Sequence, residues 1–206
     1  MNEKVPCAEC GKLVSARLAG VVNGLCLSCY DKHVEKVECL ECGKPVPASV
    51  ASKRNGLCLR CSANRNPFYV LYSSLVEQVC SSTTGFDSLS DAAKRYYALN
   101  LFQNEVNNGG FHQFFFNTSG SYHGLIENGL IDFNEPQTLE LLRQAKQIVF
   151  PNIPVPVDAE TRRGLMPAPT PDVMSKLDAL DQLFYGSPDT LTPKLEAFAR
   201  EQGLVP

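Results

Sequence analysis

Apolar residues recur at helical spacing through most of residues 67–206. In 68–80 they fall at Phe68, Leu71, Leu75 and Val79, and later segments repeat this period of three to four residues. No segment in this part alternates polar and apolar residues for long enough to predict a strand. The pattern predicts helices at 68–80, from the cap residue Ser90 to 107–110, after the cap residue Asn134, at 172–185 and at 190–202, with a short helical turn at 158–163.

The first 66 residues follow a different pattern, in which Cys-x2-Cys pairs replace apolar stripes. The spacing C-x2-C-x15-C-x2-C occurs twice, and it is typical of metal ligands because two sulfurs from one tight turn can reach one ion. The sequence therefore predicts two structural zinc sites, with iron as the alternative ion. The predicted ligands are Cys7, Cys10, Cys26 and Cys29 in the first site and Cys39, Cys42, Cys58 and Cys61 in the second.

Residues beside the cysteines predict the local fold of each site. Gly11 and Gly43 end the first knuckles, since glycine adopts positive φ without steric cost. The second knuckles are expected to open helices, whose N-terminal amides favour thiolates. Asn-Gly pairs at 23–24 and 55–56 predict turns closing hairpins. This order resembles treble-clef zinc fingers; a zinc ribbon without the helix is the alternative.

The two halves of this region form an internal repeat with an offset of 32 residues, which includes Glu9/Glu41, Lys12/Lys44 and the segments 23–27 and 55–59. The repeat favours one ion per copy over ligands interleaved between copies. Disulfides are the alternative use of eight cysteines. Residues 1–6 are polar and no apolar leader follows, so we expect a reducing, cytoplasmic location, where this spacing indicates metal. The expected domains are 1–35, 36–66 and 67–206.

Length and charge limit the remaining possibilities. Copies of about thirty residues are too short to bury a stabilising apolar core, so metal must supply folding energy, whereas residues 67–206 suffice for an ordinary core. Residues 1–66 carry ten Lys/Arg and six Asp/Glu, and residues 67–206 carry nine and sixteen, giving formal charges of +4 and −7. No apolar run is long enough to span a membrane, so no membrane partner is expected.

The segment NEVNNGGFHQFFFNTSG at 104–120 is the most distinctive part of the larger domain. With LDALDQLFYGSPDTLTPKLEAFAR at 177–200, it resembles the bacterial DNA-mimic protein family. The resemblance, over about 68–202, implies an all-helical, often dimeric domain whose acidic surface imitates DNA phosphates and binds a DNA-binding protein. The candidate carboxylates are Asp87, Asp91, Glu105, Glu127, Asp132, Glu135, Glu140, Asp178, Asp181 and Asp189, and the basic residues that interrupt them are Lys94, Arg95, Arg143, Lys146, Arg162 and Arg163.

The same segment also has a purely structural interpretation, which we favour. Asn and Gly at 107–110 are a natural helix stop, and the phenylalanines Phe111, Phe114, Phe115 and Phe116 are expected core anchors. In the alternative interpretation, a catalytic or ligand cluster is formed by Glu105, Asn107, His112 and His123. No known catalytic motif accompanies them, so we expect no enzyme.

Two single residues complete the sequence predictions. His33 is expected on the surface of a finger helix, because four thiolates already complete a tetrahedral shell, and Cys80 is expected to be a buried free thiol.

The sequence thus predicts a mainly α fold: an all-helical C-terminal domain preceded by two small four-cysteine zinc modules of treble-clef or zinc-ribbon type. The expected function is that of a non-enzymatic, regulatory interaction protein with a protein partner. The alternative is direct nucleic-acid binding through the fingers. Its candidate phosphate contacts are Lys12, Arg17, Lys44, Lys53, Arg54, Arg60 and Arg65.

Overall fold

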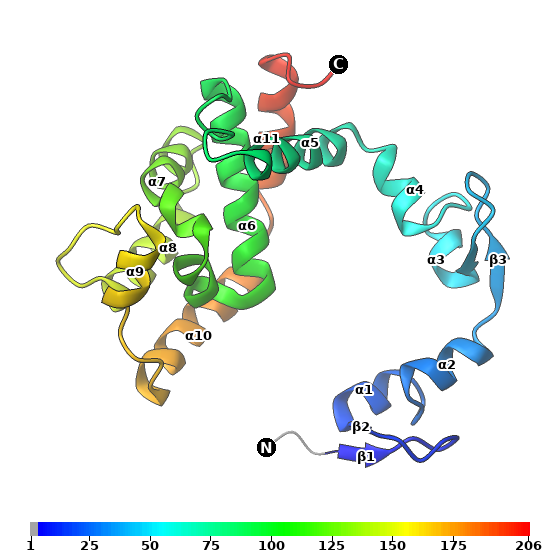
Figure 1. Ribbon diagram of the computed structural model, residues 1–206. Helices are drawn as coiled ribbons and strands as arrows, with labels where there is room; N and C mark the ends of the chain where they lie inside the picture. The colour runs from blue at the N-terminus through cyan, green and yellow to red at the C-terminus, as the bar shows by residue number, and fades with distance from the viewer. Residues whose placement is uncertain (1–3) are drawn as a thin grey trace. The chain divides into compact units, whose positions relative to one another are not determined.

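The computed structural model describes residues 4–206, apart from the side chains of Arg17 and Leu18. The chain divides into two compact units, Met1–Asn66 and Pro67–Pro206. The fold is mainly α, as predicted, with two small two-stranded sheets in the first unit (Figure 1). No helix in the described part of the chain is both long and apolar enough to cross a lipid bilayer.

The first unit consists of two modules of the same design, each with four paired cysteines. The elements of the first module are β1 (Lys4–Pro6), β2 (Leu13–Ser15), α1 (Ala16–Val21) and α2 (Leu27–His33). Those of the second module are β3 (Lys36–Glu38), β4 (Pro45–Pro47), α3 (Ala48–Ser52) and α4 (Leu59–Asn64). Each strand pair is antiparallel, with Val5 opposite Val14 and Val37 opposite Val46.

The predicted position of the hairpins is wrong. Each hairpin encloses the first cysteine pair, and a short helix, α1 or α3, stands where a strand was expected before the second pair. Asn23 and Gly24 do form the expected tight turn, with φ of 53° and 78°, but it connects a helix to the second knuckle. The reason is that Asn-Gly specifies two left-handed residues and not the elements on either side of them. The second knuckles open α2 and α4, so the helix-free zinc-ribbon alternative does not apply.

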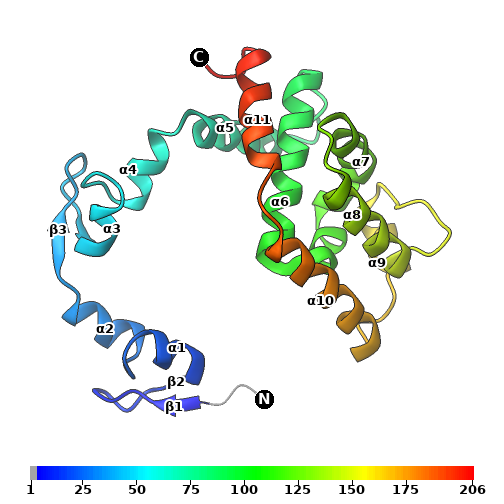
Figure 2. The same cartoon turned by 180° about the vertical axis from the view of Figure 1, so that it is seen from behind.

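The second unit is the helical domain. Its elements are α5 (Pro67–Ser81), α6 (Asp91–Phe116), the 3-10 helix η1 (Thr118–Tyr122), α7 (His123–Asp132), α8 (Pro136–Val149), α9 (Ala159–Leu165), α10 (Pro171–Gly186) and α11 (Leu191–Glu201). The helix α6 is central: α5, α7, α8, α9, α10, α11 and η1 all contact it (Figure 2). Its residues Leu99, Phe102 and Val106 are fully buried, and they hold the core of the domain together.

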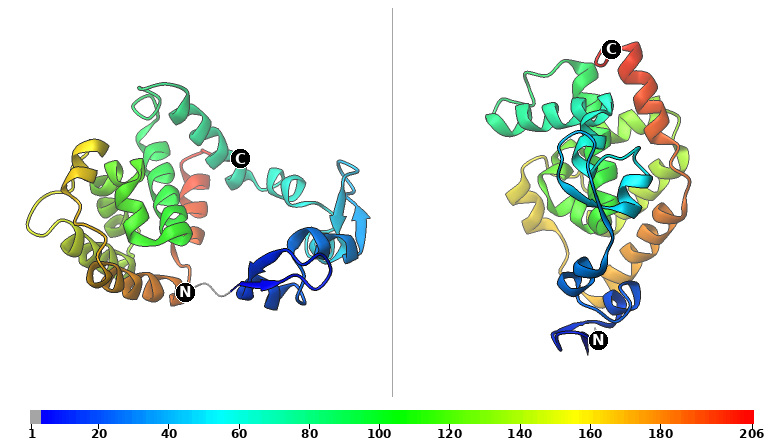
Figure 3. Two further views of the ribbon diagram at one scale, coloured as in Figure 1. Left: turned by 60° about the horizontal axis from the view of Figure 1, so that its bottom comes forward. Right: turned by 90° about the vertical axis from the view of Figure 1, so that its right-hand side faces the viewer.

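Side-chain caps place several helix starts where the sequence predicted them. Ser90 Oγ accepts the N–H of Ala93 at the start of α6, and the Asp158 carboxylate accepts the N–H of Thr161 at the start of α9. The cap of α8 was predicted one residue too early. Asn134 takes a left-handed φ of 51°, and Glu135 is the cap residue before Pro136. The segment before α9 forms a long connection without helix, which the left view of Figure 3 shows.

The Asn-Gly-Gly segment bends α6 without ending it. Helical geometry is lost at Gly109 (φ −159°, ψ 23°) and Gly110 (φ 74°, ψ −176°), and the helix then resumes as far as Phe116. The predicted helix stop is therefore only a break. It lets Phe111 turn into the core, where it is fully buried.

Two burial predictions are wrong. Phe111, Phe114 and Phe115 are core residues as predicted, but Phe116 is 46% exposed. Phe116 lies about 100° around the helix from Phe115, which turns it away from the packed face. Cys80 is exposed for the same reason, since it lies one residue beyond the packed position Val79 on α5.

Candidate functional site

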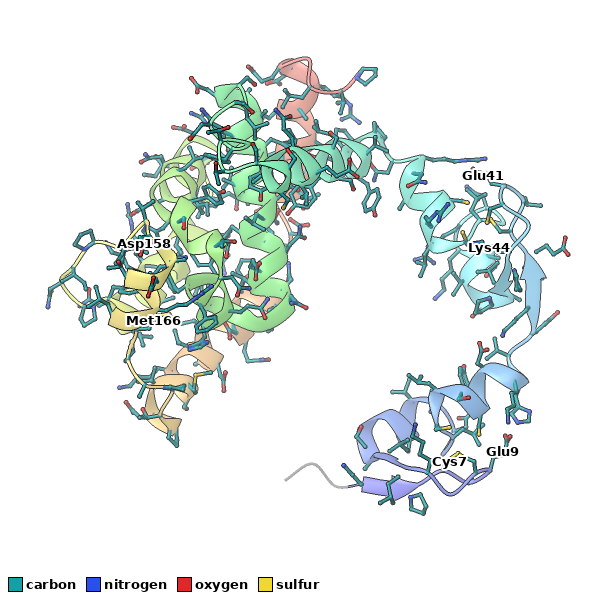
Figure 4. All side chains as sticks on the ribbon, viewed as in Figure 1. Cys7, Glu9, Glu41, Lys44, Asp158 and Met166 are labelled. Atoms are coloured by element: carbon teal, nitrogen blue, oxygen red, sulfur yellow. The ribbon has the colours of Figure 1, made fainter. Side chains whose placement is uncertain are left out.

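The eight paired cysteines gather into two clusters, one in each module. In the first, the Cys10 and Cys26 sulfurs are 3.7 Å apart, and the N–H of Cys26 donates to Cys7 Sγ at 3.1 Å. The N–H of Cys29 donates to Cys26 Sγ at 3.4 Å. The four sulfurs lie within 4.8 Å of one another. Figure 4 shows the sulfur atoms near the labelled Cys7 and Glu9.

The second cluster repeats this geometry. The Cys42 and Cys58 sulfurs are 3.8 Å apart, the N–H of Cys58 donates to Cys39 Sγ at 3.2 Å, and the N–H of Cys61 donates to Cys58 Sγ at 3.4 Å. Again the four sulfurs lie within 4.8 Å. Each cluster takes its cysteines from one copy of the repeat, so the interleaved arrangement is not the one that forms.

The sulfur spacing fits a tetrahedral metal ion. Zinc–sulfur bonds of about 2.3 Å give a tetrahedron with edges of about 3.8 Å, which matches the 3.7 Å and 3.8 Å separations. A disulfide requires about 2.05 Å, and all nine cysteines are free. Each cluster is therefore placed to hold a metal ion of the zinc type.

Backbone amides and burial act in opposite directions on the thiols. The N–H of Cys10 is the largest influence that lowers the pKa of Cys7 to about 6, and the N–H of Cys42 does the same for Cys39. Burial raises the pKa of Cys29 and that of Cys61, its counterpart, well above the ordinary value. The four sulfurs of a cluster therefore do not ionise together near neutral pH without a cation, and metal binding releases protons.

A glutamate between the two cysteines of each first knuckle holds that knuckle to the helix of its module. Glu9 accepts from His33 Nε2 at 2.7 Å and from Lys32 Nζ at 2.9 Å. These contacts lower the pKa of Glu9 to about 2, and the contact with His33 has the largest effect. Glu41 accepts from Arg65 Nε at 2.8 Å. The repeat contained Glu9 and Glu41, but only the fold reveals their partners. His33 is exposed, as predicted, and lies outside the cluster.

Some basic residues of the modules are bound to carboxylates and others are not. Lys32, Lys36 and Arg65 form ion pairs, and Arg54 is half-buried and donates to the Val50 carbonyl. The side chain of Arg17 lies outside the described residues. Among the described candidates, the exposed ones without an ion pair are Lys12, Lys44, Lys53 and Arg60.

In the helical domain, a buried carboxylate lies against the break in α6. Asp181 Oδ1 accepts the N–H of Phe111 at 2.8 Å, and burial raises the pKa of Asp181. A Cβ at Gly110 would collide with this carboxylate. Asp181 therefore caps the resumed helix from 70 residues away in sequence, which sequence reasoning did not anticipate.

The four residues of the predicted catalytic alternative are not bonded to one another in the described structure. Glu105 accepts from the amides of Gln113 and Asn117, and His112 stacks on Phe116. His123 stacks on Phe115, and its buried Nε2 has no hydrogen-bond partner within the described residues. Asn107 is exposed and lines a pocket described below.

The ten candidate phosphate mimics have different surroundings. Glu135 and Asp181 are buried. Glu127 pairs with Arg143, and Asp132 pairs with Arg95. Glu105 binds amides, and Asp189 accepts the N–H of Thr192. Asp87, Asp91, Glu140 and Asp178 are exposed and form no ion pair in the described structure, and Asp189 is likewise exposed without one.

Arg162, counted from sequence among the surface cations, is fully buried. It donates to the carbonyls of Phe115, Asn117, Pro156 and Val157, and to Ser121 Oγ. It therefore stabilises the C-terminal end of α6 and the connection before α9. Figure 4 labels Asp158 and Met166 on either side of α9, the helix that carries Arg162.

Comparison with known proteins assigns the helical domain to a family. A model of the family described as DMP19-like protein matches residues 87–202, which leaves α5 and both zinc-type modules outside the match. No curated protein and no solved structure matches the chain significantly. The matched segment is more than half of the chain and includes both motifs that carried the resemblance, and the chain therefore belongs to the DMP19-like protein family.

Proposed function

We propose that this protein is a non-enzymatic, zinc-binding interaction protein with a regulatory role. The observation that carries the proposal is the pair of four-thiol clusters with tetrahedral spacing. The cysteines are also the centre of their modules: the buried cluster of the first consists of Cys7, Cys26 and Cys29. Two structural zinc ions, each worth on the order of 10–16 kcal/mol, would provide the stability that such small cores lack.

We propose that the helical domain binds a protein partner through its carboxylates, as a mimic of DNA phosphates. The distribution of its charges supports this. Four of the domain's cations are bound to carboxylates, and Arg162 is buried, while Asp87, Asp91, Glu140 and Asp178 stay exposed without an ion pair among the described residues. A basic DNA-binding groove gains electrostatic energy from carboxylates as it does from phosphates, so a DNA-binding protein is the expected partner.

The test is competitive capture from bacterial lysate. The full chain is immobilised, and bound proteins are eluted with duplex DNA. We expect the full chain to capture DNA-binding proteins and duplex DNA to release them. A variant with Asp87, Asp91, Glu140 and Asp178 replaced by Lys should not capture them. A charge-exchanged control, Asp172→Lys with Lys176→Asp, keeps the net charge and should capture normally. Capture unaffected by both DNA and charge reversal would refute mimicry.

A second candidate function is nucleic-acid binding by the modules. The observation that favours it is the exposure of Lys12 and Lys44, which occupy the same position in the repeat and have no ion pair among the described residues. A mobility-shift titration with random duplex tests it. Retardation at low salt that weakens on Lys12→Ala/Lys44→Ala would support this function, and no retardation at low salt would dismiss it.

A further inference from the structure

Both motifs that carry the family resemblance meet at one pocket of the helical domain. The pocket has a volume of about 260 Å³. The Asn-Gly-Gly segment contributes Asn107, beside Gln103 on the same helix, and the end of α10 and the turn before α11 contribute Phe184, Tyr185 and Asp189. Segments about 80 residues apart in sequence therefore build one concave surface.

Hydrogen bonds hold the walls of this pocket in place. Tyr185 Oη donates to the Val106 carbonyl at 2.8 Å, which fixes the end of α10 to α6 just before its break. Gln103 Nε2 donates to Asp189 Oδ1 at 3.2 Å and so connects α6 to the turn before α11. The pocket is thus largely formed before any ligand arrives, as binding pockets usually are.

Asp189 is the one charged side chain among the described residues that line the pocket. Its Oδ1 accepts the N–H of Thr192 at 3.0 Å as well as the Gln103 amide. A carboxylate offers about four acceptor positions, so these two bonds leave Asp189 able to accept more. Burial acts to raise the pKa of Asp189, but its hydrogen bonds, with that from the Thr192 N–H the largest, together lower it and keep the group ionised. Because the one charged group in this lining is an anion, the pocket favours a cation over an anion.

The remaining lining suits a flat cation on an alkyl chain. Phe184 and Tyr185 provide aromatic rings, Leu141 and Leu191 provide apolar surface, and Asn107 provides an amide oxygen. A guanidinium group stacks on aromatic rings and donates in a planar fork to carboxylate and amide oxygens, while its alkyl stem packs on apolar side chains. We propose that this pocket, the Asp189 pocket, receives the guanidinium group of an arginine side chain presented by the partner protein.

The inference deepens the proposed function and rests on it, since a DNA-binding partner is rich in arginine. The test is an NMR titration of the full, zinc-loaded chain with Nα-acetyl-arginine N-methylamide. We expect amide shifts at Asn107, Ser187, Asp189 and Thr190, and much weaker shifts with the citrulline analogue, which has the same shape without the charge. Free arginine is the third ligand. If it binds more tightly than the capped residue, the natural ligand is the free amino acid, and the proposal that the arginine belongs to a partner protein is refuted.

Two matched variants separate the pocket from the general acidic field. Asp189→Asn removes the charge but keeps an oxygen that caps α11, and it should raise the Kd about fivefold, the upper range for a partly exposed ion pair. Asp178→Asn removes the same charge from an exposed position of α10 that is not among the pocket-lining residues, and should change the Kd less than about twofold. If Asp189→Asn proves unstable in thermal unfolding, Asn107→Ala, at an exposed position, is used in its place. This variant should also raise the Kd.

Equal effects of Asp189→Asn and Asp178→Asn, or equal binding of the arginine and citrulline ligands, would overturn the assignment. The titration contains no partner protein, so its failure would refute the pocket while leaving the capture experiment to decide on mimicry. Conversely, arginine binding at the pocket together with DNA-insensitive capture would retain the pocket and refute mimicry.

Discussion

Replacing Gly110 by alanine should destabilise the helical domain severely. Gly110 has φ 74° and ψ −176°, a region that only glycine adopts readily, so a side chain there costs about 1–3 kcal/mol. The new Cβ would also collide with the Asp181 carboxylate. Displacing that buried group breaks its bond with the N–H of Phe111, at a cost of about 1–3 kcal/mol. The sum is about 2–6 kcal/mol, out of about 5–15 kcal/mol for a whole domain.

Gly109→Ala is the matched control. Gly109 has φ −159°, which any residue adopts, and the nearest neighbours of its new Cβ would be atoms of the flexible Gln113 side chain, its amide end first. Thermal unfolding followed by circular dichroism at 222 nm should show a midpoint lower by about 10 °C for Gly110→Ala, at about 2–4 °C per kcal/mol, and by only a few degrees for Gly109→Ala. Equal midpoints for the two variants would refute the role assigned to the Gly110–Asp181 contact.

Three further predictions concern the metal clusters, a buried histidine and a buried arginine. Cys42→Ser should lose one zinc equivalent and unfold the second module, whereas Cys80→Ser, outside both clusters, should lose none; elemental analysis decides. Burial lowers the pKa of His123 to about 4, so between about pH 4 and 6.5 the unfolded chain binds a proton that the folded chain does not. The free energy of unfolding should therefore fall by roughly 2 kcal/mol from pH 7 to pH 5, and urea unfolding of His123→Phe should lack this part of the slope. Arg162→Met should lower the free energy of unfolding in urea by about 3–5 kcal/mol, because it leaves several buried carbonyls unpaired. Its control, Arg163→Ala, loses an exposed stacking contact with Phe116 and should lower the free energy of unfolding by about 1 kcal/mol. Equal losses for the two variants would contradict the role of Arg162.

Short-range signals in the sequence predicted much of the structure. The Cys-x2-Cys spacing identified every member of both sulfur clusters, because each knuckle is a local turn and the repeat shows which pairs belong together. Apolar period and cap residues located α5, α10 and α11 to within about two residues of their ends. The second knuckles opened helices for a local reason as well, since Cys26 and Cys58 act as cap residues.

Features that depend on contacts between distant segments could not be read from the sequence. The Asn-Gly-Gly segment by itself predicts the end of a helix, but the Asp181 carboxylate accepts the N–H of Phe111 and so lets the helix resume. Arg162 looked like a surface cation, because nothing nearby in sequence shows that the carbonyls of Phe115 and Asn117 surround it. Such burial is decided by how the helices pack, which the apolar period of a single helix does not specify.

Zinc content combined with thiol counting tests the central claim most directly. The chain, purified without added metal, should contain two zinc ions. In the native state one thiol, the exposed Cys80, should react with a thiol reagent, and all nine cysteines should react after chelation and denaturation. Much less than two equivalents of any metal, together with cysteines that stay unreactive until a reductant is added, would contradict the account.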